Sequence, residues 1–498
     1  MLYFSIHTLG CKLNQLEGEA VAEAFHREGF PVIPWEADPP SGSSRRLMLL
    51  NTCTVTSMAE QKARRLIRAA LRKGALVLVT GCYAQLNAGE LAALEEGTLG
   101  DTSPGDTSPG DTSPGEGTPG RLFIFGGDKK SALLDLPRRL AGEGGEISGR
   151  IQDWLIGFSG GPVPVPPGAV LDGRFRFAPL EFSTHTRGFL KIQDGCNRHC
   201  TYCRVRLARG ESVSLPPEEA LGRLRALEKA GYAEAVLTGV NISCYAFRDT
   251  DLAGLLDLLL GGTERIRLRL SSLEPDNIDD SLLRSLSPGR LRPHFHLSVQ
   301  SGSRRILERM GRSYGPEKAE WAVSQLRQLR GDPFLACDII VGFPGEGEDD
   351  FKETLELCER ADFAWIHVFP YSPRPGTPAW KFKGSLPQRE LSARAARLVQ
   401  LARRGRRNYI RRWIGREVEL IPETRDSDRV SPDGTGGFCA ATSENYLKLL
   451  VPRRWPRGDP DAVLRCHVRE IPLPPLRPEN AFGPLSPDGF DALGEPCF

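Results

Sequence analysis

Apolar and polar positions alternate in blocks along residues 1–95, and the same block occurs three times. Each block is a short apolar run that ends at a Gly or Asn beside a cysteine, and an amphipathic stretch of helical length follows it. The runs are LYFSIHTLGCK, RLMLLNTCT and ALVLVTGCYAQ. Strand–helix alternation of this kind predicts an open parallel sheet with helices on its faces. Ligands bind such sheets at the carboxyl ends of the strands, and Cys11, Cys53 and Cys82 all fall there.

A second strand–helix alternation occupies residues 187 to about 408. Amphipathic stretches separate its apolar runs, which are GFLKIQDG, AEAVLTGVNI, RIRLRLSSLEP, HFHLSVQSG, FLACDIIVGFPG and AWIHVFPYS. Six such units predict a partial (β/α)6 barrel with its functional groups at the carboxyl ends of the strands. The fold class is therefore α/β, with an N-terminal open parallel-sheet domain followed by this barrel.

The remaining segments differ in character. Residues 409–472 contain three short runs of strand type with turn residues between them, which predicts a small all-β module. DTSPG occurs three times at 101–115 and has no side chain to bury, so we expect a surface insertion. The predicted organisation is a domain at 1–140, a Gly- and Pro-rich linker at 141–181, the barrel at 182–408, the β module at 409–472 and a Pro-rich, irregular tail at 473–498.

Composition narrows the class of protein. The chain has 498 residues and a net charge of +2, so affinity for nucleic acid has to come from local basic patches. The N-terminal residues contain neither a signal peptide nor a transmembrane helix, and we expect a cytoplasmic protein with no membrane partner. Thiols stay reduced there, and clustered cysteines among the 12 are then metal ligands or catalysts rather than disulfides.

The stretch DGCNRHCTYCRV places Cys196, Cys200 and Cys203 within eight positions. Thiolates suit zinc, copper(I) and iron–sulfur clusters. A structural zinc site closes with four protein ligands, and no fourth Cys or His follows at a matching spacing; His199 within the loop is more typical of an exposed residue. A [4Fe–4S] cluster held by three cysteines leaves one iron without a protein ligand, where a small molecule can bind.

CNRHCTYC at the end of a first barrel strand resembles the cysteine loop of the radical S-adenosylmethionine (SAM) enzymes. The resemblance implies that SAM binds the open iron and that one electron cleaves it to methionine and a 5′-deoxyadenosyl radical. Methylthiotransferases of that superfamily are also similar at motifs along nearly the whole chain, namely HTLGCKLNQ, NTCTVT, GCYAQ, LTGVNI, SSLEP, LSVQSGS, MGRSY, DIIVGFPGE and FPYSPRPGTPA. The β module resembles a TRAM domain.

The resemblance implies two [4Fe–4S] clusters, with Cys11, Cys53 and Cys82 holding the auxiliary one. That cluster would present sulfur to a carbon radical, and a second SAM would donate the methyl group. Motif carry-over implies SAM contacts at the barrel mouth, and the Gly-Phe-Pro turn 342–344 would line the same mouth. The alternative is that Glu274 and Asp338 simply pair with barrel arginines. The implied contacts are Glu274, Gln300, Ser301, Arg312 and Asp338.

Two basic stretches point to RNA as the substrate. LARRGRRNYIRRWIGR (401–416) interleaves seven arginines with Tyr409 and Trp413, a pattern typical of RNA binding, although a solvated helix face is the alternative. AEQKARRLIRAALRK (59–73) has six basic residues to one acidic and follows Cys53. It would guide an anionic substrate toward the auxiliary cluster.

Three branches of the methylthiotransferases act on different substrates. HTLGCKLNQLEGE most resembles the branch that modifies carbon 2 of threonylcarbamoyladenosine at position 37 of tRNA. The alternatives are the isopentenyladenosine branch, the branch for an aspartate of a ribosomal protein, and a non-catalytic iron–sulfur or zinc protein that binds RNA. We expect an enzyme whose partners are tRNA, SAM, an electron donor and a sulfur donor.

Overall fold

The computed structural model describes ten stretches of the chain, and these form two compact units. The first unit takes in residues 1–183, 194–197 and 204–213, and the second takes in the rest. The predicted DTSPG insertion and most of the predicted linker lie outside the described residues. The described residues are 2–37, 45–100, 120–127, 129–142, 155, 173–182, 185–423, 438–452, 464–469 and 492–496.

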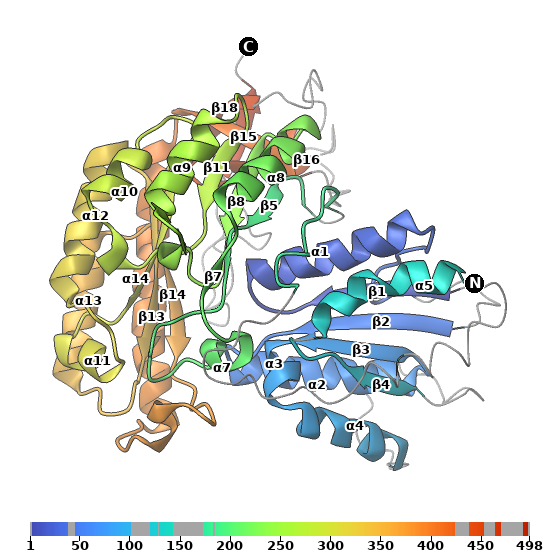
Figure 1. Ribbon diagram of the computed structural model, residues 1–498. Helices are drawn as coiled ribbons and strands as arrows, with labels where there is room; N and C mark the ends of the chain where they lie inside the picture. Colours follow the sequence, from blue (N-terminus) through green and yellow to red (C-terminus); the bar gives the residue numbers. More distant parts are fainter. Residues whose placement is uncertain are drawn as a thin grey trace. The chain divides into compact units, whose positions relative to one another are not determined.

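The first unit is built on a four-stranded parallel sheet in the order β1-β2-β3-β4 (Figure 1). Helices α1 and α5 cover one face of this sheet, and α2 and α4 cover the other. This is the open α/β sheet that the sequence predicts. The elements are β1 (Leu2–Thr8), α1 (Lys12–Arg27), β2 (Arg45–Thr52), α2 (Ser57–Arg72), β3 (Leu76–Gly81), α3 (Cys82–Leu86), α4 (Ala88–Gly100), β4 (Arg121–Ile124), η1 (Lys130–Leu134) and α5 (Leu136–Gly142).

The core of the first unit explains why its strands are apolar on both faces. Met48 and Leu50 of β2 point to the side of the sheet that α2 covers, where they join the buried Ile67 of that helix. On the opposite side, Phe4 of β1 stacks on Phe25 of α1 with ring centroids 3.7 Å apart. Strands buried on both faces read as continuous hydrophobic runs, as these do.

The second unit contains six parallel strands with helices between them. The strands are β5 (Gly188–Lys191), β8 (Glu234–Thr238), β11 (Arg267–Leu270), β12 (His294–Gln300), β13 (Phe334–Val341) and β14 (Trp365–Pro370). The helices are α8 (Pro217–Lys229), α9 (Leu252–Gly261), α10 (Asp280–Ser285), α11 (Arg304–Arg309), α12 (Pro316–Arg330), α13 (Glu348–Ala361) and α14 (Gln388–Trp413). Shorter elements of this unit are η2 (Ile242–Cys244), β9 (Ala246–Phe247), β10 (Thr250–Asp251), η3 (Pro275–Asn277) and η4 (Pro378–Lys381). Helix α7 (Val205–Arg209) belongs to the first unit, and β6 (Gln193–Asp194) and β7 (Val213–Ser214) lie where the chain passes from one unit to the other.

These strands form one curved layer. The order β5-β8-β11 makes one half and β12-β13-β14 the other. The halves meet just beyond β11, where Leu273 donates its amide to His296 O at 2.7 Å and accepts from the Ser298 amide at 2.9 Å. The predicted partial (β/α)6 barrel is thereby confirmed.

Residues 417–496 contribute a small closed β-barrel in the order β15-β16-β17-β19-β18. Its strands are β15 (Glu417–Glu423), β16 (Phe438–Ser443), β17 (Lys448–Pro452), β18 (Leu464–Arg469) and β19 (Ala492–Pro496). The predicted all-β module is confirmed, but the prediction of an entirely irregular tail is wrong. Strand β19 pairs with β17 and β18 and closes the barrel, because neither of those strands has another partner on that side.

Buried charges join the two β layers of the second unit. Glu234 of β8 accepts from Arg269 Nε at 2.6 Å and from Arg292 Nε at 2.9 Å, and all three side chains are about 1% exposed. Arg292 also reaches Glu419 of β15 at 2.8 Å. The small barrel is therefore fixed to the larger one by a desolvated ion network. No helix in the described part of the chain is long and apolar enough to cross a membrane.

Candidate functional site

Three cysteines lie at the carboxyl edge of the N-terminal sheet. Cys11 is the N-cap residue of α1, Cys53 follows β2 directly, and Cys82 is the first residue of α3 after β3. Burial, together with repulsion from charge on Cys82 and Cys11, raises the pKa of the Cys53 thiol to about 12. All three cysteines therefore lie at strand ends along one edge of the sheet, as the sequence predicts.

Side-chain amides hold the three cysteine loops together. Asn14 Nδ2 donates to Leu9 O at 2.8 Å and to Thr52 O at 3.0 Å, which ties the loop after β1 to the end of β2. Asn51 Nδ2 returns a hydrogen bond to Asn14 O at 2.9 Å. Asn51 ends the second apolar run beside Cys53, and Asn14 lies three positions after Cys11, so nearness to strand-end cysteines is the sequence signal for this role.

The edge fits a group that binds thiolates. Gly10 has φ +101°, and a Cβ there would lie 2.7 Å from Cys53 Sγ, so only glycine lets the two loops approach. The Val55 amide donates to Cys53 Sγ at 3.4 Å, an arrangement that favours a charged sulfur. Among the described residues, no three His, Cys, Asp or Glu side chains are placed to hold a single metal ion. A [4Fe–4S] cluster binds each thiolate through a different iron, so its three cysteine sulfurs lie farther apart than the ligands of a single ion.

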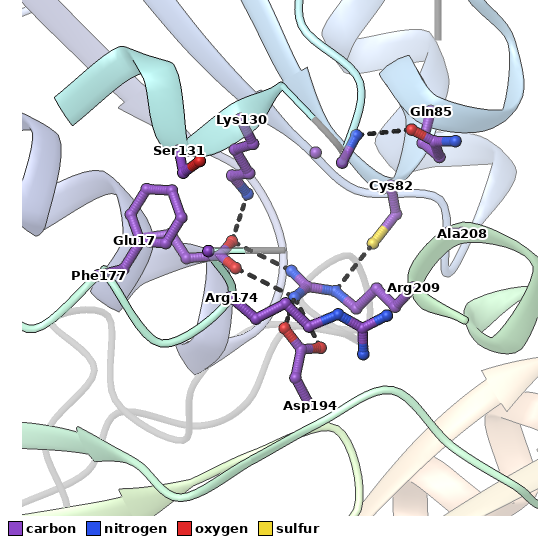
Figure 2. Close-up of a pocket in the computed structure, with 13 residues that line it drawn as sticks. Glu17, Cys82, Gln85, Lys130, Ser131, Arg174, Phe177, Asp194, Ala208 and Arg209 are labelled. Atoms are coloured by element: carbon purple, nitrogen blue, oxygen red, sulfur yellow. Dashed lines mark hydrogen bonds and ion pairs between the residues drawn. The ribbon is translucent and has the colours of Figure 1, made fainter. Parts of the chain in front are cut away.

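A buried arginine lies behind this edge. Arg209 of α7 donates from Nε to Cys82 Sγ at 3.4 Å, and its Nη1 lies 3.1 Å from both Glu17 and Asp194 (Figure 2). Lys130 is ion-paired with the same Glu17. These residues line a pocket of the first unit that opens beside Cys82. Nothing in the sequence identifies Arg209, because its partners are remote along the chain.

The second set of cysteines lies in the loop after β5. Cys196 belongs to the first unit, where its amide donates to Gly210 O at 3.1 Å, and Cys200 and Cys203 belong to the second. In the second unit the Thr201 amide donates to Met310 O at 2.9 Å. Gly311 next to it has φ +73°, and a Cβ there would lie 2.9 Å from His199 O. The MGRSY motif is therefore packed directly against the cysteine loop.

An arginine inside the cysteine loop anchors it further. Arg198 makes a bidentate ion pair with Asp276, at 2.7 and 3.0 Å, and also donates to Asn277 Oδ1 and Ser313 Oγ. Two parallel bonds of this kind fix orientation as well as distance. The loop that carries Cys200 and Cys203 is thus tied to the segment that follows β11.

Two of the predicted SAM contacts lie together at the mouth of the larger barrel. Arg312 Nη1 donates to Glu274 Oε1 at 3.2 Å and to Cys200 Sγ at 3.4 Å, and Nη2 donates to Ser298 O at 2.8 Å. Burial outweighs the Arg312 charge and raises the pKa of Glu274. Glu274 thus pairs with a barrel arginine, as its alternative interpretation expects.

The other predicted SAM contacts have different surroundings. Asp338 Oδ1 lies 3.0 Å from His296 Nε2, and His296 Nδ1 lies 2.7 Å from Ser272 Oγ, so Asp338 pairs with a histidine rather than an arginine. Gln300 ends β12 with φ +69°. Ser301 Oγ lies 3.2 Å from Thr354 Oγ1 of α13, and this contact fixes the VQSG loop to that helix. The role of these residues toward SAM stays a prediction.

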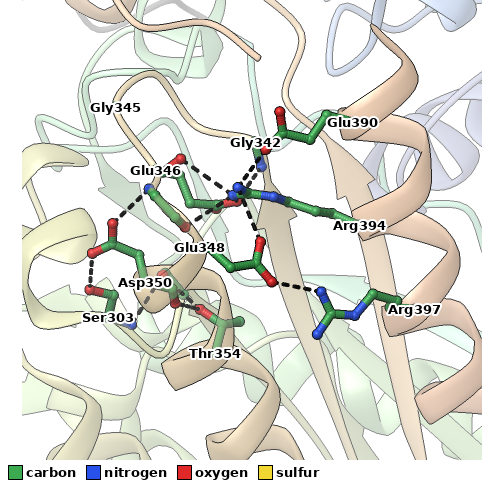
Figure 3. A network of polar contacts seen from close by, with 12 residues as sticks. Ser303, Gly342, Gly345, Glu346, Glu348, Asp350, Thr354, Glu390, Arg394 and Arg397 are labelled. Carbon is green, nitrogen blue, oxygen red and sulfur yellow. Dashed lines mark hydrogen bonds and ion pairs between the residues drawn. The ribbon is translucent and has the colours of Figure 1, made fainter. Parts of the chain in front are cut away.

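The Gly-Phe-Pro turn after β13 is held from outside the barrel (Figure 3). Glu346 accepts from the Gly342 amide at 3.0 Å and from Arg394 Nη1 of α14 at 2.8 Å. Both side chains are buried. Asp350 nearby accepts from Ser303 Oγ at 2.7 Å. The loops after β12 and β13 are thereby fixed to α13 and α14.

The RNA interpretation of 401–416 is wrong for several of its residues. This stretch is the end of α14 and the turn after it, and Tyr409 is fully buried in the core between the two barrels of the second unit. Arg403 and Arg406 are buried as well. Arg406 lies over the Phe334 ring at 4.8 Å, so its guanidinium makes a cation–π contact inside the protein.

The second basic stretch has the exposed face that the first one lacks. Helix α2 exposes Lys62, Arg65, Arg68 and Arg72, while its one acidic residue, Glu60, is buried and accepts from Thr54 Oγ1 at 2.6 Å. The exposed charged residues of α2 are therefore all basic.

Two family models match this chain. Residues 190–358 match the radical SAM superfamily, and residues 3–99 match a family described as uncharacterized protein family UPF0004. The barrel with its cysteine loop defines a radical SAM enzyme, which confirms the predicted cofactors, [4Fe–4S] iron–sulfur and SAM.

Three relatives specify the class further. The chain is 40% identical to the threonylcarbamoyladenosine tRNA methylthiotransferase MtaB of Treponema pallidum, over 94% of this chain and 98% of that protein. It is 34% identical to MtaB of Thermotoga maritima, over 84% and 86%. It is 30% identical to a tRNA-2-methylthio-N(6)-dimethylallyladenosine synthase of Thermus thermophilus, over 90% and 85%. The chain belongs to the MtaB family of tRNA methylthiotransferases.

The cysteine sets fit the cofactors of that family. Cys196, Cys200 and Cys203 would hold a [4Fe–4S] cluster, which would supply the electron that splits SAM. Around that loop the chain's own residues do three things: Arg198 fixes the loop, Arg312 holds a positive charge beside the Cys200 sulfur, and Glu274 orients Arg312. At the other edge, Gly10 makes room and Arg209 donates to the Cys82 sulfur.

Proposed function

We propose that this chain transfers a methylthio group to carbon 2 of N6-threonylcarbamoyladenosine at position 37 of tRNA. The observation that carries the proposal is the gathering of Cys11, Cys53 and Cys82 at one sheet edge, in a chain that also has the radical SAM cysteine loop. A second cluster at that edge would supply sulfur for insertion into a C–H bond. The 40% identity to an enzyme named for this substrate supports the choice of nucleoside.

The barrel mouth would bind SAM. Glu274 and Arg312 would contact the amino and carboxylate groups of SAM, and the contacts of Arg312 with Cys200 and with Glu274 support this. Asp338 faces the same barrel interior from β13, hydrogen-bonded to His296 of β12. Gln300 and Ser301 would shape the loop after β12.

The exposed face of α2 would bind the tRNA backbone. Lys62, Arg65, Arg68 and Arg72 are exposed on it, and the helix's own acidic residue, Glu60, is buried. The helix follows Cys53, so a phosphate backbone on it would lie near the auxiliary cluster's edge. Phosphate contacts position a nucleic acid without reading its sequence, and the modified base would be recognised elsewhere.

Several further components follow from this chemistry. An electron donor would reduce the radical SAM cluster, and a sulfur donor would restore the auxiliary one after each turnover. We propose that the protein works in the cytoplasm, where its tRNA substrate is found. The alternative substrates are isopentenyladenosine in tRNA and an aspartate of a ribosomal protein.

Two measurements test the proposal. Anaerobic reconstitution should give about eight iron per chain and SAM-dependent 5′-deoxyadenosine; about four iron or zinc, without SAM cleavage, would support the non-catalytic alternative. Mass spectrometry of tRNA nucleosides from cells lacking the protein should show loss of methylthiolated threonylcarbamoyladenosine. Loss of methylthiolated isopentenyladenosine instead would assign the chain to the other tRNA branch.

A further inference from the structure

Arg209 joins two parts of the sequence that the cysteine motifs leave separate. It ends α7, six positions after Cys203, and so belongs to the segment that follows the radical SAM cysteine loop. Its side chain nevertheless contacts the sulfur of Cys82, 127 positions away, in the set predicted for the auxiliary cluster. Neither the cysteine motifs nor the family models assign a role to this contact.

The geometry around Arg209 leaves its Nε–H for sulfur. Nη1 is shared by Glu17 and Asp194 at 3.1 Å, and Nη2 donates to Asn14 Oδ1 at 2.8 Å and to Glu17 at 3.1 Å. The residue is only 9% exposed. Since carboxylate and amide oxygens occupy the far end of the guanidinium, the group is oriented with Nε toward Cys82 (Figure 2).

The Nε–H of Arg209 would change the reduction potential of a cluster bound by Cys82. The reduction potential of an iron–sulfur cluster depends on its net charge and on hydrogen bonds to its sulfurs. Reduction adds negative charge, and an N–H directed at the ligating sulfur stabilises the reduced state more than the oxidised one. Removing the donor should therefore make reduction harder.

We propose that Arg209 is a positioning residue that raises the reduction potential of the auxiliary cluster by donating its Nε–H to the Cys82 sulfur. This rests on the proposed function, in which Cys11, Cys53 and Cys82 hold that cluster. The same short segment would then bear ligands of the radical cluster and a residue that tunes the auxiliary one.

Arg209→Lys is the main test, because it keeps the positive charge between Glu17 and Asp194 and lacks the Nε donor. The measurement is a redox titration followed by electron paramagnetic resonance, in full-length chains whose Cys196, Cys200 and Cys203 are alanine so that only the auxiliary cluster is seen. We expect about four iron per chain with and without the substitution. The midpoint potential should shift to a more negative value in Arg209→Lys.

Two further variants keep the result interpretable. Arg209→Gln combined with Asp194→Asn removes one charge of each sign, so the local net charge is unchanged while the sulfur loses its donor; it should show the same negative shift. Arg206→Lys is the control on the same helix, since Arg206 pairs with Glu211 at the surface. It should leave the potential unchanged.

The outcomes separate the inference from the function on which it rests. No iron in the triple-alanine chain would overturn the auxiliary site itself and the proposed function with it. Four iron with an unshifted potential in both Arg209 variants would overturn the role of Arg209 alone. An equal shift in Arg206→Lys would show that the effect is not specific to the Cys82 contact, and would also overturn it.

Discussion

Arg312 forms a buried ion pair with Glu274, with 3.1 Å between Nη2 and Oε2. The same guanidinium lies 3.4 Å from Cys200 Sγ, so the pair is in contact with the cysteine loop. Burial opposes the charge on both side chains, and the pairing offsets that cost. The geometry makes Glu274 the residue that holds Arg312 toward the sulfur.

Arg312→Lys should weaken the radical site without unfolding the barrel. Lysine keeps the charge but has no rigid fork, so it cannot contact Glu274, Ser298 O and Cys200 at once. We expect SAM-dependent 5′-deoxyadenosine formation to fall about 10–100-fold, which is typical when a partner of a metal ligand is lost. Iron content per chain should fall little.

Arg304→Lys is the matched control, because Arg304 is exposed on α11 and pairs with the exposed Glu317. It should retain full activity. Equal rates for Arg312→Lys and the unmodified chain would contradict a role of the fork at Cys200.

Glu234→Gln should destabilise the second unit strongly. Burial acts to raise the pKa of Glu234, but Arg269, Arg292 and Arg187 outweigh burial and hold the pKa well below its usual range. The substitution leaves the arginines without their shared carboxylate, and the loss of one partner of a buried ion pair costs about 3–5 kcal/mol. Urea unfolding of the unmodified chain and the variant measures the difference.

The same glutamate predicts a pH dependence. A folded-state pKa below the unfolded value of about 4.3 gives stability that is complete above that value and is lost as the pH falls toward the folded pKa. The difference between the two chains should therefore be constant near pH 7 and shrink below about pH 4. Glu317→Gln, which breaks an exposed pair, should change little at any pH.

Local patterns predict most of this fold because both sheets are parallel and each strand is followed by its own helix. Strand β19 is not predicted by local patterns. The residues Ala492–Pro496 carry no strong strand signal, and they form a strand because the edges of β17 and β18 are open to them. Strand formation depends on such non-local partners more than on intrinsic preference.

In the site, too, local patterns identify some residues, while others depend on contacts that are remote along the chain. The cysteines could be found from their spacing and their place at strand ends. The roles of Tyr409 and Arg406 could not, because an arginine-rich helix has the same local pattern whether its basic face meets solvent or packs between two barrels. Arg209 was missed because its contact with Cys82 spans 127 positions.

Replacing Arg65, Arg68 and Arg72 with glutamine should weaken tRNA binding. All three lie on the exposed face of α2. If each contacts one phosphate, the variant releases fewer counterions when it binds. The magnitude of the slope of log affinity against log salt should then decrease by about 2–3. Binding of fluorescently labelled tRNA over a range of salt concentrations measures this slope.

Arg304, Arg360 and Arg397 provide a control with the same change in charge. Each is exposed and paired with a glutamate on α12 or α13. Their replacement with glutamine should leave the salt slope unchanged. Equal effects of the two triple variants would show that net charge, rather than the face of α2, governs binding.

Gly10→Ala should empty the N-terminal cysteine edge while the barrel keeps its cluster. A Cβ at Gly10 would lie 2.6 Å from Cys53 Cβ and 2.7 Å from its sulfur, and the backbone at φ +101° disfavours any side chain. The loops after β1 and β2 must then move apart, and the three thiols lose their common geometry. Reconstituted iron should fall from about eight to about four per chain.

Gly29→Ala separates this steric effect from backbone strain. Gly29 also has a positive φ, +79°, but a Cβ there would meet nothing within 4 Å. It should bind about eight iron per chain, even if it unfolds at a slightly lower temperature. If Gly10→Ala also retained about eight iron, the close approach of Gly10 to Cys53 would not be needed for the auxiliary site. If both variants lost iron equally, backbone strain rather than the contact with Cys53 would be responsible.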